Sequence, residues 1–474
     1  METYHSLQQL QNELREGSYT LVSVVEHYLK SIEENKHLNV FLDVYHSEAI
    51  SKAQELQNKI DSGQSLGKLF GLVIGIKDVL VQKNKEVRSA SKILEGFESQ
   101  FTATSVQRLL DEDAIIIGSQ NCDEFAMGSS NENSAFGPTL NADDNLKVPG
   151  GSSGASAVSV QAGLCMAALG TDTGGSVRQP AAFCGVVGIK PTYSRVSRYG
   201  LIAFASSFDC IGVFSKNIED NALILEVISG SDDYDSTVSN KEVPEYSKQL
   251  SFNQKARVAF IKETIENEAL QEEIKNSTLE KLNWLTEQGH EVEEVTFPHL
   301  DYVLPTYYIL TTAEASSNLS RFDGVRYGYR APEAYNMESM YKLSRTQGFG
   351  EEVKRRIMLG TFVLSASYYD AYYTKAQKVR RIIRDETRDI LSKYDFIIMP
   401  TTPSTAFPLN SDRDNPAEMY LEDIFTVQAN VSGIPAISIP NGRDKSNMPI
   451  GLQVMTDVFK ENELYAFSNY LMNS

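Results

Sequence analysis

The sequence has few cysteines and few histidines for its length. Only four cysteines occur among 474 residues, and none lies within ten residues of another, which excludes a Cys-x-x-Cys zinc site and disfavours a disulfide framework. The six histidines leave the whole segment 47–289 without one. The motifs H-E-x-x-H and G-x-x-x-x-G-K-[ST] are absent as well, and the string GGSSG at 150–154, which matches G-x-S-x-G, has no histidine in its segment to serve as its base. Hydrolases, zinc enzymes and nucleotide hydrolases of those kinds are therefore excluded, and we expect no metal site.

Positive charge is also in deficit. The chain has 44 Lys and Arg against 63 Asp and Glu, a formal charge of −19. A protein whose main task is to neutralise nucleic-acid phosphates has the opposite balance, so direct nucleic-acid binding is not expected to be its central task. The longest weakly polar stretch, 155–170, contains Ser156, Ser159 and Gln161 and falls short of the ~20 apolar residues of a membrane helix. The polar, acidic N-terminus is unlike a signal peptide. We expect a cytoplasmic protein without membrane contact.

Apolar periodicity predicts an alternation of helices and buried strands. The predicted elements are helices at 20–32, 47–61 and near 265–288, a mainly helical segment at 306–390, and strands at 69–81, 114–117, 257–261 and 395–400. Such an alternation is typical of an α/β protein with a largely parallel sheet.

The chain contains no internal repeat, no low-complexity tract and no linker long enough to separate independent domains. We therefore expect one domain over 1–474. Its parts are an N-terminal helical region (1–66), a core (67–215), a surface connection (230–256) and a C-terminal part of helices and strands (300–474).

Residues 150–188 hold nine of the 30 glycines, more than three times an even share. They include two clusters, PGGSSGASA at 149–157 and GTDTGGSVRQP at 170–180. Glycine lets main-chain N–H groups converge, so Thr173, Gly174 and Gly175 could form an oxyanion hole. A turn at a strand end would explain one such cluster, but two clusters in one small-residue segment favour a site.

A serine nucleophile in this segment needs a base other than histidine. Lys77 lies within GLVIGIKDVLV, and burial can lower the pKa of a lysine toward ~7–8. Lys190 and Lys262 also follow apolar runs, and most such lysines extend to water. Only at Lys77 does the apolar run resume after the lysine, which favours Lys77 as a buried base.

GGSSGASA, DTGGSVRQPA and GIKDV, in this arrangement, resemble the amidase signature family of amide hydrolases. The resemblance implies an α/β fold with a large mixed central β-sheet covered by helices on both faces. It also implies that Ser176 is the nucleophile that forms an acyl-enzyme. Ser152, in a cis peptide bond, would relay the proton, and Lys77 would be the base.

Four neighbouring residues complete the expected catalytic region. Ser153 is expected to be a hydrogen-bonding neighbour, and Asp172 and Arg178 an ion pair that orients the nucleophile loop. Ala155 stands where the family usually has glycine. A positive φ at Ala155 would cost ~1 kcal/mol or more, and we expect the alanine to be tolerated.

Further segments resemble one branch of the family, the glutaminase subunits of tRNA-dependent amidotransferases. They are NLSRFDGVRYGYR (318–330), SRTQGFGEEVKRRIMLGTF (344–362), YYDAYYTKAQKVR (368–380) and NVSGIPAISIP with PIGLQ near the C-terminus. The branch implies B and C subunits as partners. These would receive the ammonia and hold ATP, magnesium and most tRNA contacts, so that this chain itself has no cofactor.

The same resemblance implies free glutamine as the substrate. Its α-carboxylate requires a cation and its α-ammonium an anion, because either charge is costly to bury alone. By resemblance Arg356 binds the carboxylate, Asp423 binds the ammonium and Tyr307 lies against the substrate. The neighbours Arg355 and Tyr308 leave open which residue of each pair faces solvent.

Two other functions remain open on the sequence. One is a stand-alone amidase of the same family acting on a small amide, whose pocket would not require a paired arginine and aspartate. The other is a non-catalytic scaffold, which would be favoured by a lost serine or lysine. Lys77, Ser152 and Ser176 are all present.

Overall fold

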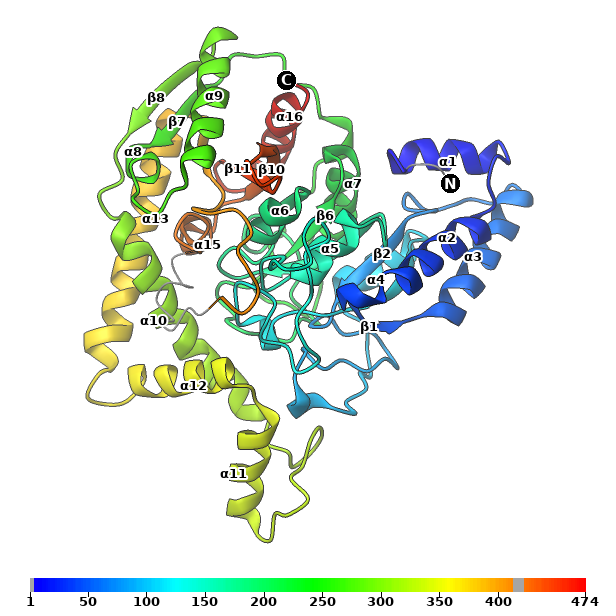
Figure 1. The fold of residues 1–474 in the computed structure, drawn as a ribbon, viewed down its shortest axis with the longest axis vertical. Coiled ribbons are helices and arrows are strands. Elements are labelled where there is room, and N and C mark those ends of the chain that lie inside the picture. Colours follow the sequence, from blue (N-terminus) through cyan, green and yellow to red (C-terminus); the bar gives the residue numbers. More distant parts are fainter. Residues whose placement is uncertain (1–3, 412–421) are drawn as a thin grey trace.

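The computed structural model describes residues 4–411 and 422–474, and these form a large sheet surrounded by helices (Figure 1). The strands are β1 (Phe41–Val44), β2 (Val73–Lys77), β3 (Ile115–Gln120), β4 (Ala167–Asp172), β5 (Val187–Lys190), β6 (Cys210–Ser215), β7 (Arg257–Ile261), β8 (Glu291–Val295), β9 (Phe396–Pro400), β10 (Ala436–Arg443) and β11 (Pro449–Met455). Within the described residues they form one sheet in the order β1-β3-β2-β4-β6-β5-β10-β11-β9-β7-β8.

Most of the sheet is covered by helices. The helices are α1 (Leu7–Arg15), α2 (Leu21–Glu34), α3 (His46–Asp61), α4 (Thr104–Asp111), α5 (Gly154–Gln161), α6 (Arg178–Cys184), α7 (Ile218–Ile228), α8 (Lys262–Ile265), α9 (Glu272–Glu287), α10 (Leu300–Asn318), α11 (Met337–Gly348), α12 (Glu351–Val363), α13 (Lys375–Lys393), α15 (Val427–Ser432) and α16 (Glu461–Met472). Helices α5 and α6 pack together on the centre of the sheet, and α7 and α16 pack on its other face. Helices α10, α13 and α15 form a further layer beside the sheet, at the left of Figure 1.

The sheet is mixed, as the family resemblance implied. Strand β2 runs parallel to β3 and β4, and β7 runs parallel to β8 and β9. Every pairing from β4 through β6, β5, β10 and β11 to β9 is antiparallel. The expectation of a largely parallel sheet is therefore wrong at the centre. Its antiparallel strands are buried on both faces and read as continuous apolar runs, the pattern usual for parallel strands.

Most predicted elements are present, with two instructive differences. Helices α2 and α3 and strand β7 match the predictions closely. Strand β2 covers only part of 69–81, because the N–H groups of Val79 and Leu80 turn back to the carbonyl of Lys77. The region 1–66 also contributes a strand, since β1 pairs with β3. In the part of the chain that the structure describes, no helix has the length and apolar character needed to cross a membrane.

Candidate active site

Lys77 lies at the end of β2 and is completely buried. Its Nζ is 2.8 Å from Ser152 Oγ, 2.8 Å from Ser153 Oγ and 2.9 Å from Thr171 Oγ1. Burial lowers the pKa of Lys77 to about 8, because the charged form is cut off from water. The lysine is thus surrounded by hydroxyl groups and can lose its proton near neutral pH, which is what a general base requires.

The glycine-rich segment before α5 carries the two serines that contact Lys77. The peptide bond between Gly151 and Ser152 is cis, as the resemblance implied. The carbonyl of Ser152 accepts a hydrogen bond from Asp123 N at 3.1 Å. A Cβ at Gly151 would lie 2.1 Å from Asp123 Oδ2, so only glycine fits there. Ser153 N donates to the carbonyl of Ser176 at 3.2 Å, which joins the two serine clusters.

The loop that follows β4 carries Ser176 and is held by an ion pair. Arg178 Nε and Nη2 donate to the two carboxylate oxygens of Asp172 at 3.0 and 2.9 Å, and both side chains are fully buried. Although burial acts to raise it, the Arg178 guanidinium lowers the pKa of Asp172 to about 2. The predicted ion pair is confirmed. Ser176 is 8% exposed while Lys77 and Ser152 are not exposed at all, so Ser176 lies nearest the entrance.

The three expected oxyanion donors differ in their hydrogen bonds. Gly175 N–H already donates to Asp172 Oδ1 at 2.9 Å. The N–H groups of Thr173 and Gly174 make no hydrogen bond within residues 4–411 and 422–474. Asp209 holds the Thr173 side chain at 2.7 Å, so this part of the loop is anchored while its N–H groups stay available. Thr173 and Gly174 are the donors that this geometry favours, and Gly175 is engaged elsewhere.

Two glycines of the loop lie against the C-terminal part of the chain. A Cβ at Gly174 would lie 2.5 Å from Tyr307 Cζ, so the tyrosine ring packs directly on the glycine. Gly175 has φ +134°, and a Cβ there would lie 2.2 Å from Thr426 Oγ1. Thr426 Oγ1 in turn donates to the Gly174 carbonyl at 2.7 Å. Larger residues at either position would displace the nucleophile loop.

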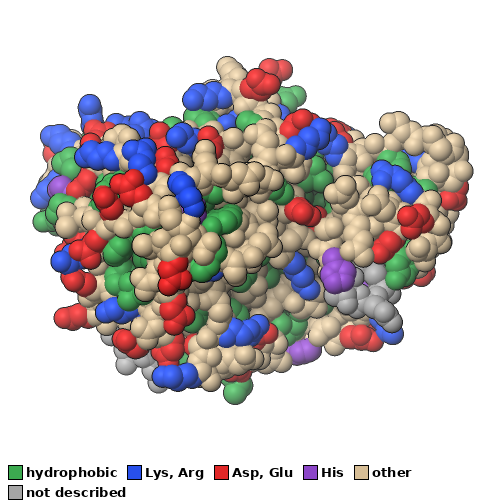
Figure 2. Space-filling model, turned by 90° about the horizontal axis from the view of Figure 1, so that it is seen from above, with side chains coloured by type: hydrophobic (Ala, Val, Ile, Leu, Met, Phe, Trp, Pro, Cys, Tyr) green, Lys and Arg blue, Asp and Glu red, His purple; other side chains and the backbone are tan. Residues whose placement is uncertain are grey.

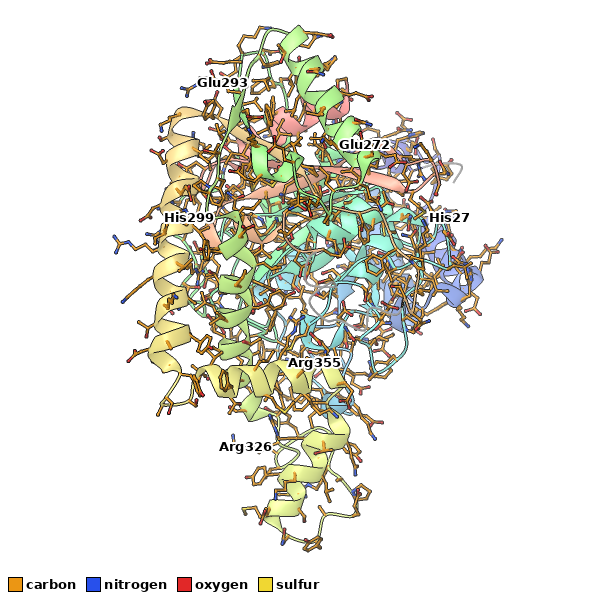
Figure 3. All side chains as sticks on the ribbon, turned by 60° about the vertical axis from the view of Figure 1, so that its left-hand side comes forward. His27, Glu272, Glu293, His299, Arg326 and Arg355 are labelled. Atoms are coloured by element: carbon orange, nitrogen blue, oxygen red, sulfur yellow. The ribbon has the colours of Figure 1, made fainter. Side chains whose placement is uncertain are left out.

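On α12, Arg356 is buried and Arg355 is not. The side chain of Arg355 is 45% exposed and projects from the helix (Figure 3). Arg356 Nε donates to Glu352 Oε1 at 2.8 Å, and its guanidinium lies over the rings of Phe204 and Tyr308. Of the two neighbouring arginines, the structure thus buries the one that the resemblance selected.

Asp423 is buried and accepts hydrogen bonds from two hydroxyl groups. Tyr308 Oη donates to Asp423 Oδ2 at 2.9 Å, and Ser129 Oγ lies 3.0 Å from the same oxygen. Burial raises the pKa of Asp423 to about 7, although both hydrogen bonds and the Arg356 charge oppose the rise. Tyr307 is buried against Gly174, so the two adjacent tyrosines face different parts of the site.

Several residues of this site were missed in the sequence, and one expectation was wrong. Thr171, Ser129 and Tyr308 contact predicted residues, but a single sequence has no signal for contacts between distant segments. Lys190 does not extend to water: it is fully buried, and its Nζ donates to the Pro191 carbonyl at 2.8 Å. The cause is that β5, which ends at Lys190, lies in the middle of the sheet with helices on it.

Ala155 is accommodated without strain. It lies in the first turn of α5, outside the positive-φ residues, and its N–H donates to Asn131 Oδ1 at 3.0 Å. In the described ranges, no group of three or more His, Cys, Asp or Glu side chains is arranged to hold a metal ion.

The fold and this site define the class of the protein. A model of the amidase family matches residues 23–465, and the chain belongs to that family. The A subunit of glutamyl-tRNA(Gln) amidotransferase from Chlorobium limicola is 50% identical over 470 residues, which cover 98% of each chain. The corresponding protein of Chlorobaculum tepidum is 48% identical over 99% of this chain and 98% of its own. The predicted resemblance to this branch over nearly the whole chain is therefore confirmed.

Two solved structures place the fold in the same family. The crystal structure of the A subunit of glutamyl-tRNA(Gln) amidotransferase from Thermotoga maritima has a TM-score of 0.77 and 41% identity, covering 94% of this chain and 90% of that one. The peptide amidase of Stenotrophomonas maltophilia has a TM-score of 0.84 at 25% identity, covering 99% and 97%. The chain is thus an enzyme of the amidase family, similar in sequence to amidotransferase A subunits.

Proposed function

We propose that the chain is the glutaminase subunit of a tRNA-dependent amidotransferase, the role that the names of its relatives describe. It would hydrolyse the side-chain amide of glutamine and supply ammonia to a partner that converts Glu-tRNA(Gln) to Gln-tRNA(Gln). The observation that carries the proposal is the buried hydrogen bond from Lys77 to Ser152. The next residue, Ser153, is hydrogen-bonded through its N–H to the carbonyl of Ser176.

The mechanism follows from the order of these groups. Neutral Lys77 takes the proton of Ser152, and Ser152 takes the proton of Ser176 as Ser176 Oγ attacks the amide carbon. The N–H groups of Thr173 and Gly174 stabilise the resulting oxyanion. Return of the proton through Ser152 to the amide nitrogen lets ammonia leave as the acyl-enzyme forms. A water molecule then attacks the glutamyl ester, gives its proton up along the same path, and Ser176 recovers a proton as glutamate leaves.

Substrate choice would come from two buried charged residues, Arg356 and Asp423. Arg356 would pair with the α-carboxylate of glutamine and Asp423 with its α-ammonium. Free glutamine carries both charges, whereas a simple amide carries neither. Arg356 and Asp423 are both buried, so the charges of glutamine would be costly to bury in this site if either residue were missing.

The partners would supply the remaining chemistry. By the same proposal this chain forms a hetero-oligomer with B and C subunits in the cytoplasm, and ATP, magnesium and most tRNA contacts belong to them. The A-subunit names of its relatives support an assembly of several subunits.

The test uses the assembled complex with Ser176→Ala. Glutamine-dependent formation of Gln-tRNA(Gln) should fall by several orders of magnitude, because no acyl-enzyme can form. Ammonium chloride should restore the amidation, since the chemistry of the partner does not use the serine. Failure of ammonium to rescue a complex that assembles normally would contradict the division of labour. Rapid-quench mass spectrometry of the wild-type complex should find the glutamyl adduct on Ser176, and an adduct on Ser152 or Cys184 would contradict its role.

A further inference from the structure

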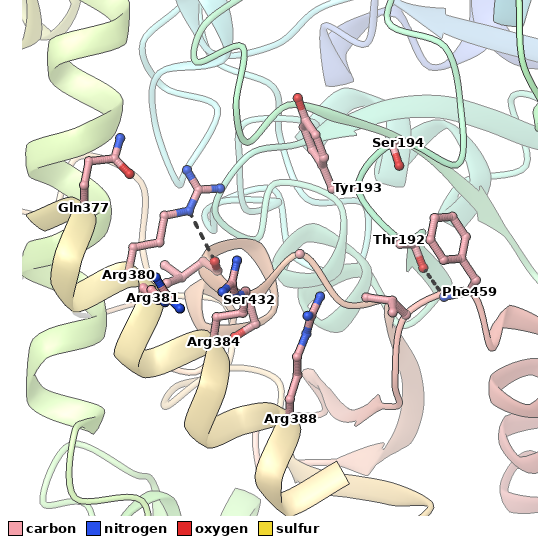
Figure 4. A pocket seen from close by; sticks show the side chains of 13 residues that line it. Thr192, Tyr193, Ser194, Gln377, Arg380, Arg381, Arg384, Arg388, Ser432 and Phe459 are labelled. Carbon is pink, nitrogen blue, oxygen red and sulfur yellow. Dashed lines mark hydrogen bonds between the residues drawn. The ribbon is translucent and has the colours of Figure 1, made fainter. Parts of the chain in front are cut away.

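A basic cavity lies between α13 and three short segments, 192–194, 431–433 at the end of α15, and 458–459. Its volume is about 560 Å³, within the range of small-molecule sites. Lys77, Ser152 and Ser176 do not line it. One wall consists of four arginines of α13, which Figure 4 shows side by side: Arg380, Arg381, Arg384 and Arg388. Such a cluster is unexpected in a chain of charge −19, over whose surface both signs of charge occur (Figure 2).

The arginines are only partly neutralised. Arg381 and Arg384 share the single carboxylate of Asp385, at 3.5 and 3.0 Å. Arg388 makes no hydrogen bond or ion pair with any residue that the structure describes. The other acidic residues of this stretch have their own partners, since Glu386 bonds His299 and Asp389 pairs with Lys393. The wall therefore has a clear excess of positive charge.

Arg380 differs from the other three arginines because its guanidinium is held by neighbouring residues of the fold. Its Nη1 donates to Ser207 Oγ and its Nη2 to the Ser207 carbonyl, both at 2.9 Å. Its guanidinium also lies 4.0 Å from the centre of the Phe208 ring. Arg380 thus fixes the base of the cavity, and the other arginines remain available at its rim.

The opposite wall is polar and preformed. It contains the hydroxyl groups of Thr192, Ser194 and Ser432. Tyr193 N donates to the Gly433 carbonyl at 3.2 Å, which joins two of these segments. Phe459 N donates to Thr192 Oγ1 at 2.8 Å and fixes the third (Figure 4). A ligand would meet hydroxyl donors from this side and guanidinium donors from α13.

We propose that this cavity binds the phosphate group of a ligand. A carboxylate offers two oxygens, and one arginine fork can satisfy it. A phosphate group offers three acceptor oxygens and a charge of −1.5 to about −2, which suits several guanidinium groups and hydroxyl donors together. The phosphate can belong to a free phosphorylated compound or to an RNA backbone, and the cavity size favours the free compound.

The experiment compares the full chain with two charge-reversal variants. Arg384→Glu/Arg388→Glu removes cations of the cavity and leaves Arg380 intact. Arg326→Glu is the matched control, because Arg326 is exposed on the distant loop before α11 (Figure 3). Isothermal titration with pyrophosphate should show binding to the wild type, at least tenfold weaker binding to the double variant, and less than twofold change in the control. Circular dichroism and thermal unfolding establish that all three chains are folded.

Two further titrations identify the source of the phosphate. If unacylated tRNA binds the wild type, loses affinity in the double variant and is displaced by pyrophosphate, the site takes RNA phosphates. If only pyrophosphate shows this dependence, the ligand is a free compound. Absence of pyrophosphate binding, or equal binding to the double variant, overturns the proposal. So does tighter binding of an oligoglutamate peptide than of pyrophosphate, which would mark the cavity as a site for an acidic protein segment.

Discussion

The hydroxyl of Ser153 can only accept a hydrogen bond from Lys77, because its own proton is donated to the carbonyl of Thr171 at 3.0 Å. A charged lysine has three N–H donors, and three hydroxyl oxygens surround Nζ. Neutral Lys77 has only two donors and one lone pair. If Ser153 and Thr171 take the two donors, the lone pair is directed at Ser152, which is the orientation that proton transfer requires.

We predict that Thr171→Val lowers kcat of the glutaminase reaction by about 10- to 100-fold with little change in KM, because misorientation of a catalytic group by ~1 Å can cost about 10²-fold. Thr171→Ser keeps the hydroxyl and should retain most activity. Steady-state measurement of kcat and KM for both variants tests whether the Thr171 hydroxyl supports catalysis. Equal losses in the two would show that the methyl group, and not the hydroxyl, is what matters.

We predict that kcat/KM of the glutaminase reaction rises with pH through an apparent pKa of about 8. The base is active when neutral, so activity is lost as the pH falls through this value and the lysine is protonated. A pH–rate profile of the wild-type complex measures it. Lys77→Arg should be nearly inactive throughout, because a guanidinium keeps its proton. Full activity of that variant would exclude Lys77 as the base.

We predict that Arg356→Ala weakens transition-state binding of glutamine by ~2–5 kcal/mol, because the α-carboxylate would be left buried without a cation. Hydrolysis of a simple amide that lacks both α-groups should change far less. Arg355→Ala is the matched control on the preceding position of α12. It should have little effect, because that side chain is 45% exposed and its loss leaves the ion pair between Arg356 and Glu352 in place. Comparable losses on both substrates would assign Arg356 a structural role.

Asp423→Ala should cause a loss of the same ~2–5 kcal/mol on glutamine, because the α-ammonium would then be buried without an anion. Tyr308→Phe removes one hydrogen bond to Asp423 but keeps the carboxylate, so its effect should be smaller. Measurement of kcat/KM with glutamine and with a simple amide separates recognition from stability. A loss in Tyr308→Phe equal to that in Asp423→Ala would mean that the tyrosine itself contacts the substrate.

We predict that Arg178→Met lowers the free energy of unfolding by ~3–5 kcal/mol, because it leaves the Asp172 carboxylate buried without its partner. Urea unfolding measures the change. Arg443→Met breaks an exposed ion pair with Asp143 and should cost less than ~1 kcal/mol. Similar losses in the two variants would show that burial of the pair does not matter.

Features formed by residues close together in the sequence could be predicted, whereas contacts between residues far apart in the sequence could not. The strand that ends at Lys77 and the two serine clusters are continuous segments, and their motifs predicted the family and the fold class. The resemblance supplied Arg356 and Asp423, and burial then separated Arg356 from Arg355. Periodicity could not show where the sheet becomes antiparallel.

The remaining contacts had no signal in the sequence. Ser129 and Asp423 are 294 positions apart, and no local pattern links the two residues. Thr171 lies within the second serine cluster, but its side chain had no feature that set it apart from other strand residues. The hydrogen bond from Gly175 to Asp172 depends on the exact turn of the loop, which glycine-rich sequences leave open.

The hydrogen bonds of Arg178 have a consequence for the synthesis of the chain. Besides Asp172, its guanidinium donates to the Thr426 carbonyl, Asn430 Oδ1 and Gln453 Oε1, which follow it by 248, 252 and 275 positions. At ~5–20 residues per second, Gln453 is added roughly 14–55 s after Arg178. Until then the growing chain on the ribosome lacks one of the acceptors that hold the Arg178 guanidinium. We therefore expect a chain that stops before Gln453 to be a poor amide hydrolase, because the hydrogen bonds around Arg178 are incomplete in it.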